Sequence, residues 1–240
     1  MRFFGKFRKR LLDKNQLGSY LKYAVGEIAL VVIGILIAVS INNWNEGRKQ
    51  EKTLSNILAT VATEMARDTV LLERIIDYYQ SREDTFLHII NDALSREETI
   101  NCKVCPFLVS SYRSFTPNLK GYDLLREFVD FNETSEDTLV ANIIFVYSNY
   151  TIEFETWSNM ISNNVAGNLA YWRDHYPWYA NFLMRKYEEP YYDYVVSEAD
   201  YRNRVTHQYV LVYENFLRDL RNYNRQVKMM LTQIRQRTVE

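Results

Sequence analysis

A run of fourteen apolar or small residues near the N-terminus constrains this chain more than any other feature. Residues 28–41, IALVVIGILIAVSI, carry no charge. Extended to Tyr23 and Trp44, aromatic side chains of the kind that lie at membrane interfaces, the segment measures about 32 Å as a helix. That length matches the roughly 30 Å hydrocarbon core of a bilayer. The sequence therefore predicts a single transmembrane helix at residues 23–44, with the lipid bilayer as its first partner.

Basic residues on the N-terminal side set the expected orientation of this helix. Residues 1–22 carry seven lysines and arginines against one acid, Asp13. This excess predicts a basic cytoplasmic tail at residues 1–22 and an extracytoplasmic helical domain at residues 45–240. The alternative is a cleaved signal peptide with a small-x-small site at Ala38-Val39-Ser40. The long basic leader and Glu27 inside the segment argue against it.

One stripe of the predicted transmembrane helix is a candidate contact face for another helix. Glu27, Gly34, Ala38 and Ile41 share this stripe, and Gly34 and Ala38 form a small-x-x-x-small pair that allows close approach. An ionisable group inside a membrane segment is a functional hypothesis by default. The alternative is that Glu27 reaches the cytoplasmic interface and the small residues have no role.

The residues around this segment also carry a distinctive sequence. Gly26-Glu27-Ile28 precedes the apolar run, and Asn42-Asn43-Trp44-Asn45-Glu46 follows it. This combination, within YAVGEIALVVIGILIAVSINNWNE, resembles the hallmark of an uncharacterised family of bacterial single-pass inner-membrane proteins. Val25, Ser40 and the pair Cys102/Cys105 depart from the usual pattern of that family. The resemblance implies an inner-membrane location, so the large domain would be periplasmic, and it implies no known activity.

Composition favours helices and argues against nucleic-acid binding. Glycine (7) and proline (4) are scarce, as expected for a helical chain rather than a turn-rich β fold. Beyond Glu27, 22 lysines and arginines face 28 aspartates and glutamates, so the exported part is mildly acidic. The expected fold is therefore all-α: the single N-terminal transmembrane helix followed by an elongated antiparallel helical bundle.

Hydrophobic periodicity predicts three long amphipathic helices in that bundle. The first covers residues 48–96, the second starts at a capping box, Thr134-x-x-Asp137, and ends at Gly167, and the third starts at a box, Ser197-x-x-Asp200. A short helix is expected at 122–131. The irregular segment 97–121 includes a block, 109–115, that could pack on the bundle as an extended piece. Pro190 is expected to end any helix in the connector 168–190.

The cysteine pair and an aromatic cluster are the candidate sites of the large domain. Outside the cytoplasm Cys102 and Cys105 are expected to form a local disulfide; free thiols or a metal or redox site are the alternatives. The clustered rings could bind a ligand or a partner, or could instead close the end of the bundle. These rings are Tyr171, Trp172, Tyr176, Trp178, Tyr179, Tyr187, Tyr191 and Tyr192.

Motifs for catalysis or for cofactors are missing from the sequence. It has no Gly-rich phosphate loop, no nucleophile elbow and no His-Glu-x-x-His. We therefore expect no catalytic residue, no cofactor and no metal. The leading hypothesis is a non-enzymatic, membrane-anchored interaction or scaffold module, within an oligomer or with another membrane protein. The alternative is a periplasmic small-ligand sensor that uses the aromatic connector 171–192.

Overall fold

The computed structural model describes residues 17–132 and 137–239, and every regular element among them is helical. The chain divides into two compact units, Met1–Ser55 and Asn56–Glu240. The all-α prediction is confirmed. The basic tail predicted at residues 1–22 lies largely outside the described residues.

The first unit contains the beginning of α2 (Leu17–Gln80). The apolar side chains of residues 28–41 are exposed along it, with Leu30 71% and Ile41 60% accessible. Within the described residues, one helix is long and apolar enough to cross a membrane, and it is α2.

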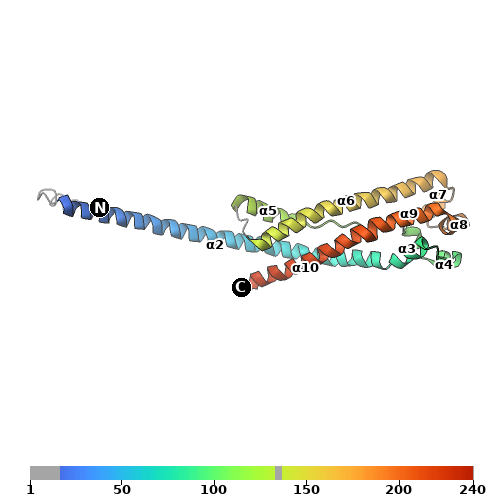
Figure 1. The fold of residues 1–240 in the computed structure, drawn as a ribbon, viewed down its shortest axis with the longest axis horizontal. Helices are drawn as coiled ribbons and strands as arrows, with labels where there is room; N and C mark the ends of the chain where they lie inside the picture. The colour runs from blue at the N-terminus through green and yellow to red at the C-terminus, as the bar shows by residue number, and fades with distance from the viewer. Residues whose placement is uncertain (1–16, 133–136, 240) are drawn as a thin grey trace. The chain divides into compact units, whose positions relative to one another are not determined.

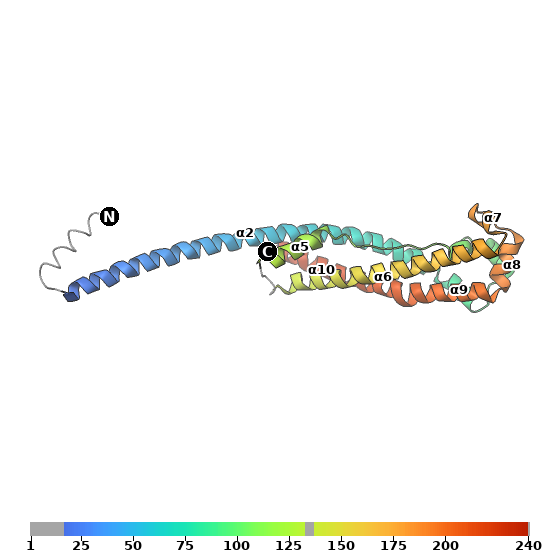
Figure 2. The same ribbon diagram turned by 90° about the horizontal axis from the view of Figure 1, so that it is seen from above.

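Three long helical segments form the second unit (Figures 1 and 2): the remainder of α2, then α6 (Thr138–His175), then α9 (Ala199–Tyr209) continued by the π-helix η2 (Val210–Phe216) and α10 (Leu217–Val239). The last segment runs antiparallel to both others. On α2, Tyr213 bonds to Tyr79 and Lys228 to Glu73, and on α6, Gln226 bonds to Tyr150. The apolar residues that recur every three or four positions in this last segment are buried, apart from Tyr209: Val205, Val212, Phe216, Leu220, Tyr223, Val227, Leu231 and Ile234.

An extended strap, residues 111–119, runs antiparallel to α2 between the small helix η1 (Cys105–Phe107) and α5 (Lys120–Asn132). The Tyr79 hydroxyl donates to the Arg113 carbonyl at 2.7 Å and accepts from its amide at 2.8 Å. Five residues further on, the Asn118 amide donates to Asp68 at 3.0 Å. Tyr79 and Asp68 are about 16 Å apart along a helix, and five extended residues also cover about 16 Å. The extended form therefore matches the spacing of its anchors. The block predicted at 109–115 begins too early, because residues 109 and 110 form a turn and the strap starts at residue 111.

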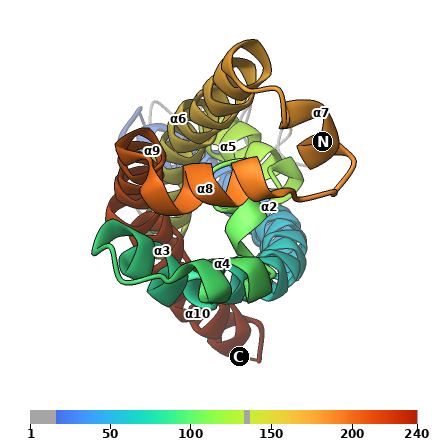
Figure 3. The same cartoon turned by 90° about the vertical axis from the view of Figure 1, so that its right-hand side faces the viewer.

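Short helices close the far end of the second unit, where Figure 3 shows α8 (Glu189–Ser197) lying across the bundle end. Beside it lie α3 (Glu83–Ile90), α4 (Arg96–Asn101) and α7 (Tyr179–Leu183). Arg96 forms ion pairs with Glu189 and Asp193, which join α4 to α8. Arg202 of α9 pairs with Asp92 at 2.6 Å.

The C-terminal boundary predicted for the first bundle helix is wrong. A single helix to residue 96 was expected, but α2 ends at Gln80 and α3 ends at Ile90. The Tyr79 carbonyl at the end of α2 accepts from the Tyr213 hydroxyl at 3.0 Å as well as from the Arg82 amide at 2.9 Å. Asp92 adopts a left-handed conformation (φ 58°) just after α3, a role that aspartate tolerates better than most residues.

The second predicted helix extends further than expected, because Gly167 does not end it. α6 continues to His175, and Gly167 has an ordinary helical conformation on the exposed side. Asn168 and Trp172, which follow it on one face, are buried and hold the last turns against the bundle. The next residue, Tyr176, caps the helix; it precedes Pro177 and is extended (φ −127°, ψ 120°), as proline requires of the residue before it.

Two further boundaries differ from the predictions. Pro190 lies in the first turn of α8, where its missing amide costs nothing, and so it begins a helix instead of ending one. Ser197 is the last residue of α8 and does not cap α9. A capping box does exist at Ser95 and Glu98, opening α4. At the start of α6, Asp137 is itself the N-cap, while Thr134 lies outside the described residues.

Candidate functional site

The predicted contact face of the apolar segment 28–41 and its flanks is uncovered within its unit. Glu27, Gly34, Ala38 and Ile41 are all exposed. A Cβ atom built on Gly34 would meet nothing within 4 Å. Where the segment ends, the Arg48 guanidinium lies 5.0 Å from the centre of the Trp44 ring, an aromatic and a basic group of the kind found at membrane interfaces.

The cysteine pair is joined: Cys102 and Cys105 form a disulfide, with Cα atoms 5.5 Å apart. The Cys105 amide also donates to Cys102 Sγ at 3.0 Å. Cys105 is buried, and its carbonyl accepts from the Tyr201 hydroxyl at 3.3 Å. The bridge therefore closes a turn that is attached to α9. In the described part of the chain, no group of three or more His, Cys, Asp or Glu side chains could hold a metal ion.

The aromatic residues singled out in the sequence come together at the far end of the second unit. Trp172, Trp178 and Tyr191 are buried there, and the others are half-buried. Ring centres lie 5.5 Å apart for Trp172 and Trp178 and 5.2 Å apart for Trp178 and Tyr191. The half-buried rings are Tyr171, Tyr176, Tyr179, Tyr187 and Tyr192. This mutual packing fits the closing of a bundle end and leaves the rings in contact with one another.

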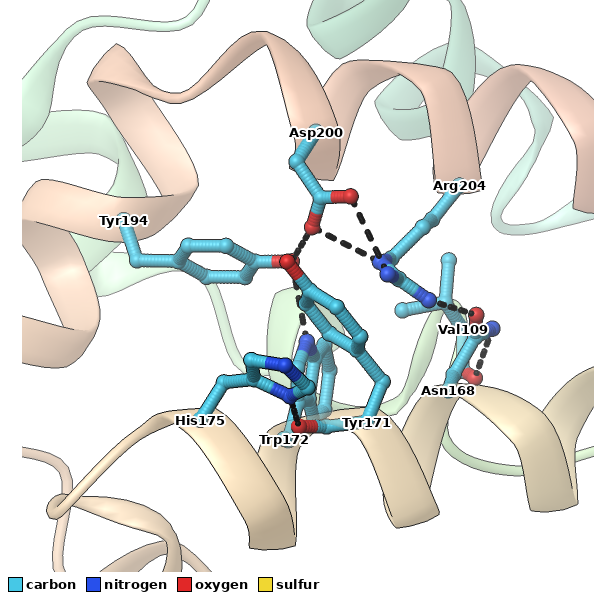
Figure 4. Close-up of polar contacts among 8 residues, drawn as sticks. All are labelled: Val109, Asn168, Tyr171, Trp172, His175, Tyr194, Asp200 and Arg204. Atoms are coloured by element: carbon cyan, nitrogen blue, oxygen red, sulfur yellow. Dashed lines mark hydrogen bonds and ion pairs between the residues drawn. The ribbon is translucent and has the colours of Figure 1, made fainter.

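A chain of hydrogen bonds runs through this cluster and joins α6, α8 and α9 (Figure 4). Trp172 Nε1 donates to the Tyr194 hydroxyl at 2.9 Å, and that hydroxyl donates to Asp200 Oδ2 at 2.6 Å. Arg204 binds both carboxylate oxygens of Asp200, at 2.8 and 3.0 Å. Its third nitrogen donates to Asn168 Oδ1 at 2.9 Å, while Asn168 Nδ2 donates to the carbonyl of Val109 at 3.0 Å.

Burial and the Arg204 guanidinium together set the pKa values of the groups in this network. Burial alone would raise the pKa of Asp200, but the bonds from Arg204 and Tyr194 outweigh it and hold that pKa below its ordinary value. Burial and the bond to Asp200 raise the pKa of Tyr194, so its hydroxyl stays protonated and donates. The Arg204 guanidinium also lies 3.9 Å from the Tyr171 ring, which stacks on His175. Each polar group in the chain is satisfied, so the network fixes three helices together.

This network was missed by the sequence reasoning, although part of it leaves a signal. Asp200 and Arg204 have the i, i+4 spacing that places opposite charges side by side on a helix. Asn168 and Trp172 share the same spacing and hence one face of α6. Nothing local predicts that Tyr194 would connect the two faces, because that contact depends on how α8 crosses the bundle end.

A buried carboxylate, Asp68 of α2, anchors the strap. Asp68 is 1% exposed and accepts bonds from the amide and the side chain of Asn118. Burial raises the pKa of Asp68, and the nearby charge of Glu64 adds to this effect, while the Asn118 bonds oppose it. Glu64 itself accepts from the Gly121 amide at 2.7 Å. The sequence did not identify this pair of anchors.

Comparison with known proteins places the chain in a family without giving it a function. A model described as a family of unknown function (DUF6090) matches residues 27–152, which include the apolar segment, the strap, α5 and the first part of α6. No curated protein and no solved structure matches the chain. Since the match covers more than half of the sequence, the chain belongs to this family of unknown function, DUF6090.

Proposed function

We propose that this protein is a membrane-anchored, non-enzymatic interaction module that associates with itself or with another membrane protein through its transmembrane helix. The observation that carries the proposal is the uncovered face of Glu27, Gly34, Ala38 and Ile41. Small residues on such a face let two helix backbones approach closely in lipid, where packing and polar contacts drive association. Across that contact, Glu27 would pair with a polar or basic group.

The proposed topology has the N-terminus in the cytoplasm and the helical domain in the periplasm of a bacterial inner membrane. Seven basic residues before the apolar run support it, since short basic flanks stay on the cytoplasmic side. Protease added to intact spheroplasts should then cut the protein beyond Arg48. Full protection of that region would overturn this orientation, and a mature protein that starts near Ile41 and washes off the membrane would overturn the anchor.

The ligand-sensor alternative depends on the rings of residues 171–192 and has less support. Such a sensor needs a cavity between the rings. Trp172, Trp178 and Tyr191 instead contact one another and are buried. The sensor therefore requires the bundle end to open, whereas the interaction module uses a surface that is already uncovered.

The test is crosslinking of the full chain in its native membrane. Gly34→Leu and Ala38→Leu place a large side chain on the proposed face. Ala29→Leu makes the same change on the opposite face, about 150° around the helix at 100° per residue. We expect the first two variants to lose most of the crosslinked species and Ala29→Leu to keep it. Absence of any crosslinked species in the natural protein, or equal loss in all three variants, would reject the proposal.

A further inference from the structure

The turn that follows α7, at the far end of the second unit, exposes four consecutive side chains (Figure 2). Two of them are large and apolar: Leu183 is 56% exposed and Met184 71%. The next two, Arg185 and Lys186, are basic. Exposed apolar side chains rimmed by charged ones are typical of an interaction site. Residues 183–186 are called the tip below.

The backbone of the tip holds Arg185 in an unusual conformation. Its φ of 59° lies in the left-handed region. The Arg185 amide donates to the Phe182 carbonyl at 2.9 Å, and the Lys186 amide donates to the Asn181 carbonyl at 2.9 Å. These two bonds form the common helix ending in which glycine is the usual residue at the left-handed position. Arginine is less favourable there than glycine, so the turn alone does not account for this residue.

Phe182 fixes the tip to the bundle. Its ring is buried, with its centre 5.2 Å from that of Trp172. The half-buried rings of Tyr179 and Tyr187 have centres 6.4 and 5.9 Å from that of Phe182. Tyrosine is enriched where a protein meets the surface of a membrane. The exposed apolar side chains therefore project from a firmly held base with tyrosines on both sides of them in the sequence.

The tip carries positive charge that no ion pair within the described residues neutralises. Residues 179–187 include Arg185 and Lys186 and no acid. Neither basic side chain pairs with a described carboxylate. The nearest acids in the sequence each have another partner, so the tip complements a negatively charged surface. These acids are Asp174 with Arg173, Glu188 with Asn181, and Glu189 and Asp193 with Arg96.

We propose that the tip binds the surface of a second membrane, one that carries anionic phospholipids and faces the membrane of the anchor. Leu183 and Met184 enter the boundary between headgroups and acyl chains, while Arg185 and Lys186 contact the phosphate groups. A bilayer accepts a projecting apolar turn without a preformed pocket, whereas a protein partner would have to supply one.

The position of the tip in its unit favours a second membrane over the first. Within the second unit, α2 runs about 36 Å from Asn56 to Gln80. α7 lies at the end where α3 and α4 follow Gln80 (Figure 1). The chain enters the unit from the apolar segment at the other end, so the tip is distant from that point of entry.

The test is capture of vesicles by the full chain, reconstituted in liposomes of phosphatidylcholine. Many copies in one liposome act together, so capture reports even a weak contact. Fluorescent acceptor vesicles with about one-third phosphatidylglycerol should be captured, and acceptors of phosphatidylcholine alone should not. Capture should weaken between about 0.1 M and about 1 M salt, as the Debye length falls from about 10 Å to about 3 Å.

Two basic substitutions test the charge of the tip. Arg185→Gly with Lys186→Gln should raise the concentration of anionic vesicles at half-maximal capture at least tenfold, since each basic residue near an anionic surface contributes about fivefold. Arg221→Gln with Arg225→Gln, which removes two exposed charges from α10, is the matched control and should not. Arg185→Gly should melt in micelles at the same or a higher temperature, because glycine suits the left-handed turn, so its lost capture is not a folding defect.

Two apolar substitutions test insertion. Leu183→Ser with Met184→Ser should raise the same concentration by at least tenfold, because the transfer of both side chains out of water is lost. Leu71→Ser with Met160→Ser replaces two apolar side chains that are each 45% exposed on α2 and α6, and this control should leave capture unchanged.

Equal capture of neutral and anionic vesicles, capture only when the acceptors also contain the protein, or unchanged capture in either tip variant would overturn the proposal. So would the absence of capture, which is the result expected if the tip contacts only the membrane of the anchor. The tip is distinct from the helix face of the proposed function, and the outcomes are separable. Ala38→Leu should lose the crosslinked species and keep capture, whereas the two tip variants should do the reverse.

Discussion

The Tyr194 hydroxyl donates a 2.6 Å hydrogen bond to the carboxylate of Asp200 and accepts one of 2.9 Å from Trp172. One oxygen atom thus joins α8 to both α6 and α9. Tyr191, one turn earlier in α8, is equally buried, but its hydroxyl has no partner among the described residues. The two tyrosines differ in what their hydroxyls contact, which makes them a matched pair for measuring the network.

Tyr194→Phe should lower the free energy of unfolding by roughly 1–3 kcal/mol, because it leaves the buried Trp172 indole N–H without a partner and removes one of the two hydrogen bonds to Asp200 Oδ2. Tyr191→Phe should leave stability unchanged or raise it, since the hydroxyl it removes is buried and unsatisfied. Urea denaturation of the full chain in micelles compares the two. Equal losses in both variants would show that ring packing, and not the hydroxyl, holds α8 in place.

Acid should weaken the fold through Asp200. The pKa of Asp200 lies below its ordinary value of 3.8 in the folded protein, so its contribution is present above pH 3.8 and is lost as pH falls through the lower folded value. The stability contribution of Asp68 depends on pH in the opposite direction. Its pKa is raised in the folded protein, so the contribution is present at low pH and is lost as pH rises through the raised pKa. Asp200→Asn should be less stable than the natural protein at pH 7 and should show a smaller loss between pH 6 and pH 3. If Asp200→Asn loses as much unfolding free energy between pH 6 and pH 3 as the natural protein, Asp200 does not cause the loss of stability in acid.

Most of the helical core could be predicted from the sequence, because periodicity reports directly on burial. Most apolar positions in the seams of α6 and of the last helix are buried, as Ile143, Phe154 and Val227 illustrate. The exceptions are half-buried: Leu139, Tyr150, Trp157 and Tyr209. The break after Gln80 could not be predicted in this way. It involves no proline or glycine and coincides with a contact from Tyr213, more than 130 residues away in the chain.

Local signals also failed where tertiary contacts outweighed them. Gly167 carries a cost of roughly 1 kcal/mol in a helix, which burial of Trp172 one turn later more than offsets. Ser197 and Asp200 have the spacing of a capping box, but Asp200 is held by Tyr194 and Arg204 instead. The strap contacts to Asp68 and Glu64 link residues 50 or more apart, and no pattern along the chain records them.

Reduction of the bridge between Cys102 and Cys105 should lower stability modestly. The closed loop is very short, so the loss of chain entropy in the unfolded state corresponds to about 2 kcal/mol. The melting temperature should therefore fall when a reductant is added, and the double variant Cys102→Ser, Cys105→Ser should melt at the temperature of the reduced protein. The contrary result is that neither the reductant nor the double variant changes the melting temperature. That result would mean that the turn is held by Tyr201 alone.

Two glycines should respond in opposite directions to the same substitution. A Cβ atom at Gly121 would lie 2.9 Å from the backbone of Val61, so Gly121→Ala should push α5 away from α2 and destabilise the fold by roughly 1–3 kcal/mol. A Cβ atom at Gly167 would meet nothing within 4 Å, so Gly167→Ala should stabilise α6 by about 0.5–1 kcal/mol through reduced freedom of the unfolded chain. Thermal melting of both variants in micelles decides the matter. If Gly121→Ala melts at or above the temperature of the natural protein, then α5 does not pack on α2 as closely as the contact with Val61 requires.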